Sequence, residues 1–138
     1  SGGLWAPMGD ERIKAAMPMG AEGFDMTGPA GLAEATASVL LIGAGADNIN
    51  DYDPATTELF AHYPGAELIT FVDAGHMMIF DAAAAAQMGR FATAHFGYHL
   101  AGRDDYARFL TREYVEEQAP ALDESVSFAT LAWGVPEE

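Results

Sequence analysis

Two short, mainly apolar runs, each followed by a glycine-containing turn and one polar residue, dominate the hydrophobic pattern of this chain. Residues 39–44 lead through such a turn to Asp47, and residues 68–72 lead through another to His76. Short runs of aliphatic and β-branched side chains are typical of strands that are buried on both faces. The pattern therefore predicts two buried strands, each ending in a turn that presents one polar side chain.

The segment before these strands is less regular. Residues 12–19 form a short apolar run that we expect to be a strand, closed by Pro18 and Gly20. Residues 21–31 are rich in glycine and contain a proline, a composition typical of loops, although some of their apolar side chains could face a cavity. Residues 32–37 predict a single helical turn.

A helical pattern follows each of the two buried strands. Residues 54–63 predict one helix, because Asp53 suits the N-cap and Pro54 suits the first helical position. A longer helix is expected from residue 82 to about residue 100, capped by Asp81, since its alanine run has a high helix propensity. Residues 104–118 predict one or two short helices, and the alternating residues 125–131 predict a short edge strand.

The order of these elements is strand, loop, strand, helix, strand, helix. Such alternation is typical of α/β proteins that have a parallel sheet with crossover helices. Three strands make a small sheet, and the strand at residues 39–44 needs a neighbour on each edge, so one apolar edge of the sheet would stay open. We therefore expect strands from another polypeptide to complete the sheet.

Composition limits the classes of partner. The chain of 138 residues is long enough for one domain, half of its residues are hydrophobic, and it contains no cysteine, which excludes disulfides and thiolate metal sites. The formal net charge of −15 makes nucleic acid and anionic membranes unsuitable partners. No apolar run approaches the roughly 20 residues needed to span a bilayer. A soluble protein is expected, and the pattern does not assign its compartment.

Asp47 and His76 are the strongest candidates for chemistry. Because both follow neighbouring parallel strands, we expect them at the same carboxyl edge of the sheet, where catalytic groups gather. An aspartate there would accept the imidazole Nδ1–H, and the histidine would take a proton from a nucleophile. The alternative is two turn residues with no shared role. The paired arrangement favours an acid–base dyad.

Four segments resemble the α/β-hydrolases, in particular the dienelactone-hydrolase-like branch that includes esterases related to platelet-activating-factor acetylhydrolase. Residues 43–47 resemble the acid turn of that family, and residues 73–77 its histidine turn. Residues 10–19 are similar to the strand that follows the nucleophile helix, and residues 95–102 to the end of the last long helix. The resemblance covers roughly residues 10–118.

The resemblance implies that the chain is one partial α/β-hydrolase domain, the C-terminal three-strand portion of the parallel sheet with its flanking helices. Residues 1–10 would be a loop, residues 11–103 the sheet and its helices, and residues 104–138 a helical and tail extension. Asp47 matches the family's acid and His76 its base. Both would serve a serine hydrolase that cleaves carboxylic esters of small molecules through an acyl-enzyme, without a metal or organic cofactor.

The nucleophile of such an enzyme is missing from this chain. The family's Gly-x-Ser-x-Gly elbow, the strands before it and its oxyanion-hole loop are absent. Ser1 is not an elbow serine, because Pro7 and Gly9 break the helix that would have to follow it. An autoproteolytic N-terminus at Ser1 is a further alternative that nothing else in the chain supports. We expect an upstream chain to carry the serine, and this chain to be inactive alone.

Several other residues are candidates for binding. Met77, Phe24 and Met19 are expected to line a substrate pocket, Met77 foremost because it follows His76. His95 and His99 have a helical spacing that can chelate zinc, but no third ligand is evident, and histidines near a helix C-terminus interact favourably with the helix dipole.

Acidic pairs are the remaining candidates for a metal. The pairs Asp51/Asp53 and Asp104/Asp105 could attract calcium, but helix capping already explains Asp53. A structural role is therefore expected for both histidines and both acidic pairs.

Two functional classes thus stay open. The first is the esterase portion described above, and the second is a non-catalytic, hydrolase-like module for binding or regulation. A third hypothesis, a small stand-alone flavodoxin-like domain, is disfavoured by the few predicted strands.

Overall fold

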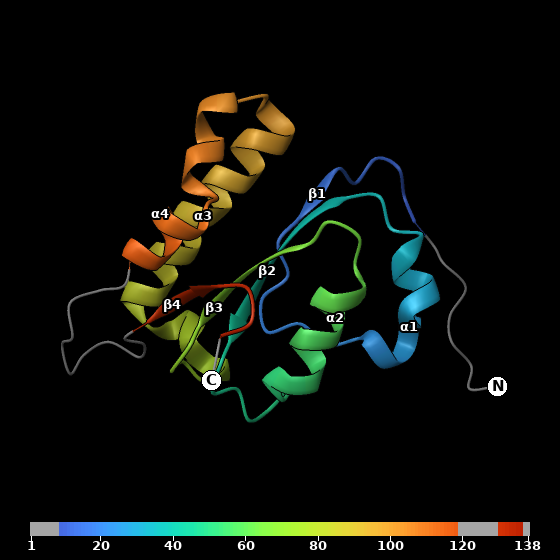
Figure 1. Cartoon of the computed structure of the whole chain (residues 1–138), viewed down its shortest axis with the longest axis horizontal. Helices are drawn as coiled ribbons and strands as arrows, with labels where there is room; N and C mark the ends of the chain where they lie inside the picture. The colour runs from blue at the N-terminus through green and yellow to red at the C-terminus, as the bar shows by residue number, and fades with distance from the viewer. Residues whose placement is uncertain (1–8, 119–129, 137–138) are drawn as a thin grey trace.

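A four-stranded mixed sheet forms the centre of the protein, as seen in the computed structural model, which describes residues 9–118 and 130–136 (Figure 1). The strands lie side by side in the order β1-β2-β3-β4, and they are β1 (Ala15–Ala16), β2 (Ser38–Ala44), β3 (Glu67–Phe71) and β4 (Leu131–Trp133). The first three strands are parallel, and β4 is antiparallel to β3. The expected α/β class is confirmed.

Both buried strands expected from the apolar runs are present. In the β2–β3 pairing, Leu40 lies opposite Glu67 and Ile42 lies opposite Ile69. Because side chains alternate across a sheet, Leu40 and Ile42 share one face, whereas Val39 packs with the opposite face. Each strand thus supplies two separate hydrophobic clusters, one on each side of the sheet.

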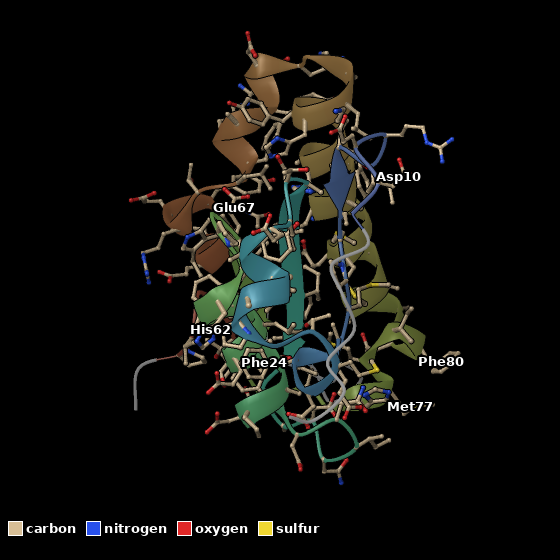
Figure 2. All side chains as sticks on the ribbon, turned by 90° about the vertical axis from the view of Figure 1, so that its right-hand side faces the viewer. Asp10, Phe24, His62, Glu67, Met77 and Phe80 are labelled. Carbon is tan, nitrogen blue, oxygen red and sulfur yellow. The ribbon has the colours of Figure 1, made fainter. Side chains whose placement is uncertain are left out.

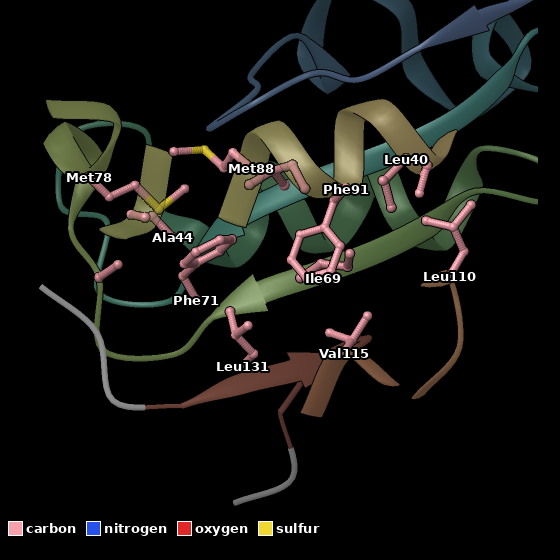
Figure 3. Close-up of a cluster of buried hydrophobic side chains, with 14 residues drawn as sticks. Leu40, Ala44, Ile69, Phe71, Met78, Met88, Phe91, Leu110, Val115 and Leu131 are labelled. Atoms are coloured by element: carbon pink, nitrogen blue, oxygen red, sulfur yellow. The ribbon is translucent and has the colours of Figure 1, made fainter. Parts of the chain in front are cut away.

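The larger core lies between the sheet and helix α3 (Ala82–Ala101) (Figure 3). Asp81 caps this helix as expected, since its side chain accepts a 2.8 Å hydrogen bond from the backbone N–H of Ala84. Met88 and Phe91 face the sheet from α3 and are buried. Helices η3 (Asp104–Phe109) and α4 (Arg112–Glu117) close this core with buried residues such as Val115.

The opposite face of the sheet is covered by α1 (Phe24–Ala33) and α2 (Thr57–His62) (Figure 1). A short π-helical segment, η1 (Tyr52–Thr56), precedes α2. Asp53 was expected to cap the helix that begins at Pro54, but its side chain accepts no capping hydrogen bond from the backbone. Its carboxylate instead accepts a 2.7 Å hydrogen bond from the Thr57 hydroxyl.

The prediction of a loop at residues 21–31 is wrong, because α1 occupies most of this segment. Gly28 breaks this helix with a φ of 61°, and Pro29 follows the break, at the start of the second helical piece, where a missing N–H is tolerated. Phe24 anchors the first piece on α2, with its ring 5.0 Å from that of His62. Glycine and proline here divide a helix and do not prevent it.

The sheet also differs from the expected three parallel strands. β4 adds an antiparallel fourth strand that covers the edge of β3, and it comes from the segment expected to be a tail. The edge strand was expected at residues 125–131, of which 125–129 lie outside the described residues, as do residues 1–8 of the expected N-terminal loop. β1 is shorter than expected, although Met19 bridges to Ile42 farther along.

None of the helices in the described ranges has the length and apolar character required to cross a membrane.

Candidate active site

The turns after β2 and β3 are joined to each other. The backbone N–H of Ala46, in the first turn, donates a 2.9 Å hydrogen bond to the carbonyl of Ala74 in the second. A side chain at Gly45 would overlap the backbone carbonyl of Val72, so the first turn can lie this close to the second only with glycine there. The two turns therefore form one unit at the carboxyl edge of the sheet.

Asp47 and His76 meet on this unit. His76 is the first residue of the short helix η2 (His76–Phe80), and its Nδ1 lies 2.8 Å from Oδ2 of Asp47. The Asp47 side chain is only 3% exposed, whereas that of His76 is 28% exposed. The acid is thus enclosed, and the imidazole that it contacts still reaches solvent.

The second carboxylate oxygen of Asp47 is also held. Its Oδ1 accepts hydrogen bonds from the backbone N–H groups of Ile49 (2.9 Å) and Asn50 (3.1 Å). Burial by itself raises the pKa of Asp47, but the hydrogen bonds from His76, Ile49 and Asn50 outweigh it, so the pKa lies below its ordinary value of 3.8. The acid is therefore ionised at neutral pH and oriented by three donors.

A third segment closes over the pair. The side-chain amide of Asn50 donates a 2.8 Å hydrogen bond to the carbonyl of Gly20, whose own N–H bonds to the carbonyl of Ile42 in β2. Gly20 has a φ of 52°, and a Cβ atom there would lie 3.5 Å from Nδ1 of His76. Sequence reasoning missed the roles of Asn50 and Gly20, because neither contact follows from a local pattern.

The expected substrate-binding residues are not all in one place. Met77 adjoins His76 and is 58% exposed, and Met19 is exposed directly before Gly20. Phe24 packs on His62 and lines a separate pocket of about 460 Å³ that also includes Asn50. In Figure 2, Phe24 and His62 lie to the left and Met77 to the right.

No nucleophile accompanies the pair in the described part of the chain. The Nε2 atom of His76 has no hydrogen-bond partner among the described residues, and the chain contains no cysteine. Ser38 begins β2 and therefore lies at the opposite end of the sheet. Ser1 lies outside the described residues.

The structure also assembles one group that sequence reasoning missed. Glu67 comes close to His95 and His99, and within residues 9–118 and 130–136 these three form the only cluster of potential metal ligands. One feature of the sequence could have indicated this contact. Side chains alternate along a strand, so Glu67 lies on the same face of the sheet as Ile69. The acidic pairs Asp51/Asp53 and Asp104/Asp105 are not part of this cluster.

Comparison with protein-family models and with curated proteins finds no match to this chain. Any function therefore has to rest on the geometry of its sites.

Proposed function

We propose that this chain supplies the acid and the base of a serine hydrolase of the α/β-hydrolase type, acting on carboxylic esters. The observation that carries this proposal is the 2.8 Å contact between Nδ1 of His76 and the buried carboxylate of Asp47. It lies where two neighbouring parallel strands end, and an open α/β sheet binds its ligands at that edge.

The geometry divides the roles of the two residues. An ionised Asp47 accepts a hydrogen bond from the Nδ1–H group of His76, and this tautomer leaves Nε2 with a lone pair. Because the imidazole is partly exposed, Nε2 is able to receive a proton from a serine hydroxyl that approaches from outside. Asp47 holds the ring in this tautomer and stabilises the imidazolium once it forms.

The reaction then follows from proton transfers at Nε2. The serine oxygen attacks the ester carbonyl while His76 takes its proton, and His76 returns that proton to the departing alcohol. Water attacks the resulting acyl-enzyme with His76 again as the base, which releases the acid and restores the serine. These steps use no metal.

The nucleophile is assigned to an upstream polypeptide. β1 pairs with β2 on one side, and no described strand pairs with its other edge. A strand from the upstream polypeptide, added at this edge, would extend the parallel sheet in the order expected for an α/β-hydrolase. Ile13 and Met19, which flank β1, are exposed and would be covered by such an addition.

Exposed apolar side chains beside His76 support a binding role for this edge. Met77, Ile79 and Phe80 all belong to η2 and are exposed, although each is large and apolar. Exposed apolar clusters of this kind mark binding surfaces. Met77 is assigned to the ester substrate because it directly follows the base.

A second candidate is a hydrolase-like module that binds a ligand or regulates a partner without catalysis. It is favoured by one observation, the Nε2 atom of His76 that has no hydroxyl partner in the described part of the chain. In this alternative the pair of Asp47 and His76 would stabilise the joined turns only.

Isolation of the chain from the cells that produce it separates these candidates. For the esterase, we expect a co-purifying polypeptide that contains a Gly-x-Ser-x-Gly sequence and reacts with a fluorophosphonate probe. His76→Ala should abolish labelling and ester hydrolysis by the complex, whereas His62→Ala, which changes a histidine in α2, should preserve both. Near-normal turnover in His76→Ala, or a stable chain that purifies alone, would contradict the proposal.

A further inference from the structure

A half-buried carboxylate, that of Glu67, lies at the end of the sheet opposite to the Asp47–His76 pair. Glu67 begins β3 and pairs in register with Leu40, so its side chain lies on the same face as Ile69 and Phe71. Those two residues belong to the core under α3 (Figure 3). In Figure 2, Glu67 lies above and to the left of Met77.

Helix α3 places histidines against this carboxylate. Met88 and Phe91 form the stripe of α3 that faces the sheet, and His95 continues that stripe one turn later with 0% of its surface exposed. His99 follows after another turn, and the two imidazole rings lie 4.7 Å apart. Apolar residues would be expected at these positions if they served only packing.

Two polar atoms of this cluster lack a hydrogen-bond partner. Oε2 of Glu67 and Nδ1 of His95 are both buried without a hydrogen bond. Buried polar groups are nearly always paired, so two unpaired atoms in one cluster require an explanation.

The tautomer of His95 also supports a ligand at this cluster. Its Nε2 lies 3.3 Å from the carbonyl oxygen of Ser38, an acceptor that requires the ring proton on Nε2. Nδ1 then carries the lone pair. Histidines that bind metals are commonly fixed in this way, with one nitrogen on a backbone carbonyl and the other on the ion.

We propose that Glu67, His95 and His99 bind a divalent transition-metal ion, and that Zn²⁺ fits this site best. One potential ligand atom from each residue lies within 4.8 Å of the other two. A tetrahedral zinc ion with bonds of about 2.1 Å holds its ligand atoms roughly 3.4 Å apart. Ion binding would therefore draw the ligand atoms closer together, and Glu67 and His99 are the partly exposed side chains that have room to turn.

The ligand types decide between metals. Two imidazoles and a carboxylate form a common zinc ligand set, whereas calcium and magnesium prefer oxygen ligands throughout. Three protein ligands leave the fourth tetrahedral position to water. The bound ion would join β3 to α3 and neutralise Glu67. This inference is independent of the proposed esterase function.

Metal binding by the 138-residue chain tests the site directly. After removal of metal by chelation, calorimetric titration with Zn²⁺ should show one saturable site, and Co²⁺ should give visible absorption bands of a bound ion. Glu67→Gln and His99→Gln should each weaken binding by about tenfold or more. These partly exposed positions are preferable to the fully buried His95, whose loss would threaten folding.

Matched variants test whether the other two histidines contribute to zinc binding. His62→Gln and His76→Gln remove imidazoles outside the cluster and should leave the affinity for Zn²⁺ unchanged. Circular dichroism checks that every variant is folded. A folded chain without saturable Zn²⁺ binding would overturn the proposal, as would full affinity in His99→Gln or loss of binding in His76→Gln.

Discussion

The side chain of Asn50 connects the acid turn to the segment that follows β1, through a 2.8 Å hydrogen bond to the carbonyl of Gly20. The backbone N–H of the same residue holds Oδ1 of Asp47. One residue thus links the orientation of the acid to the position of the glycine that lies over His76.

Asn50→Ala is therefore expected to loosen this connection. Loss of the hydrogen bond leaves the Gly20 carbonyl without its partner, which should lower the free energy of unfolding by about 1 kcal/mol. Urea denaturation measures this change. Asn48→Ala is the matched control, because Asn48 is exposed and makes no side-chain hydrogen bond within the described residues. An equal effect of both substitutions would contradict the assigned role of Asn50.

Gly45→Ala should destabilise the joined turns. The new methyl group would overlap the backbone carbonyl of Val72, which cannot move aside as a flexible side chain can, so a loss of about 1–3 kcal/mol or more is expected. Thermal denaturation of the two glycine variants provides the comparison. Gly75→Ala should be neutral or slightly stabilising, because Gly75 has a φ of −90° and its Cβ would lie 3.8 Å from the nearest atom. If the Gly45→Ala variant is as stable as the Gly75→Ala variant, the two turns do not require glycine at position 45.

Asp47 should contribute to stability in a pH-dependent way. Its pKa in the folded protein lies below the ordinary value of 3.8, so the folded state binds fewer protons than the unfolded state in this region. Ionised Asp47 thus stabilises the fold above the ordinary pKa, and this contribution disappears as the pH falls through the lowered value.

The measurement is the difference in free energy of unfolding between the wild-type chain and Asp47→Asn. This difference should be largest near neutral pH and shrink as the pH falls below 3.8, the ordinary pKa of an aspartate. Asp51→Asn is the control, because Asp51 is exposed and its side chain makes no hydrogen bond in the described part of the chain. A difference for Asp47→Asn that stays constant over this range would exclude the ionised carboxylate as its source.

Met77→Ala tests the assignment of substrate binding. In the assembled esterase we expect KM to rise roughly tenfold with a smaller change in kcat, because the side chain contacts the substrate and takes no part in proton transfer. Steady-state kinetics with a series of esters measures both constants. Leu100→Ala removes another exposed apolar side chain, near the far end of α3, and should leave both unchanged. Unaltered KM in Met77→Ala would refute the assignment.

The parts of the fold that were predicted correctly depend on local patterns. β2 and β3 follow from continuous apolar runs, and α3 follows from an alanine run with a capping aspartate at residue 81. α1 was missed because Gly28 and Pro29 read as loop residues, whereas its two pieces are supported by packing of Phe24 on α2. The helix depends on contacts between segments that are far apart in the sequence, and composition does not reveal such contacts.

The candidate sites divide in the same way. The proximity of Asp47 and His76 followed from strand order, since neighbouring parallel strands end at one edge, and the structure brings the two together. Their catalytic role stays a prediction. The meeting of Glu67 with His95 depends on how α3 packs across β3, and spacing along the chain carries no information about that packing.

The antiparallel strand β4 limits where a further strand can join the sheet. It occupies the backbone groups of β3 that would otherwise accept another strand. Within the described residues, β1 and β4 form the two edges of the sheet, and the edge at β1 is the one that continues its parallel part. An upstream strand and a second copy of this chain would compete for the same backbone groups, so binding of one there excludes the other.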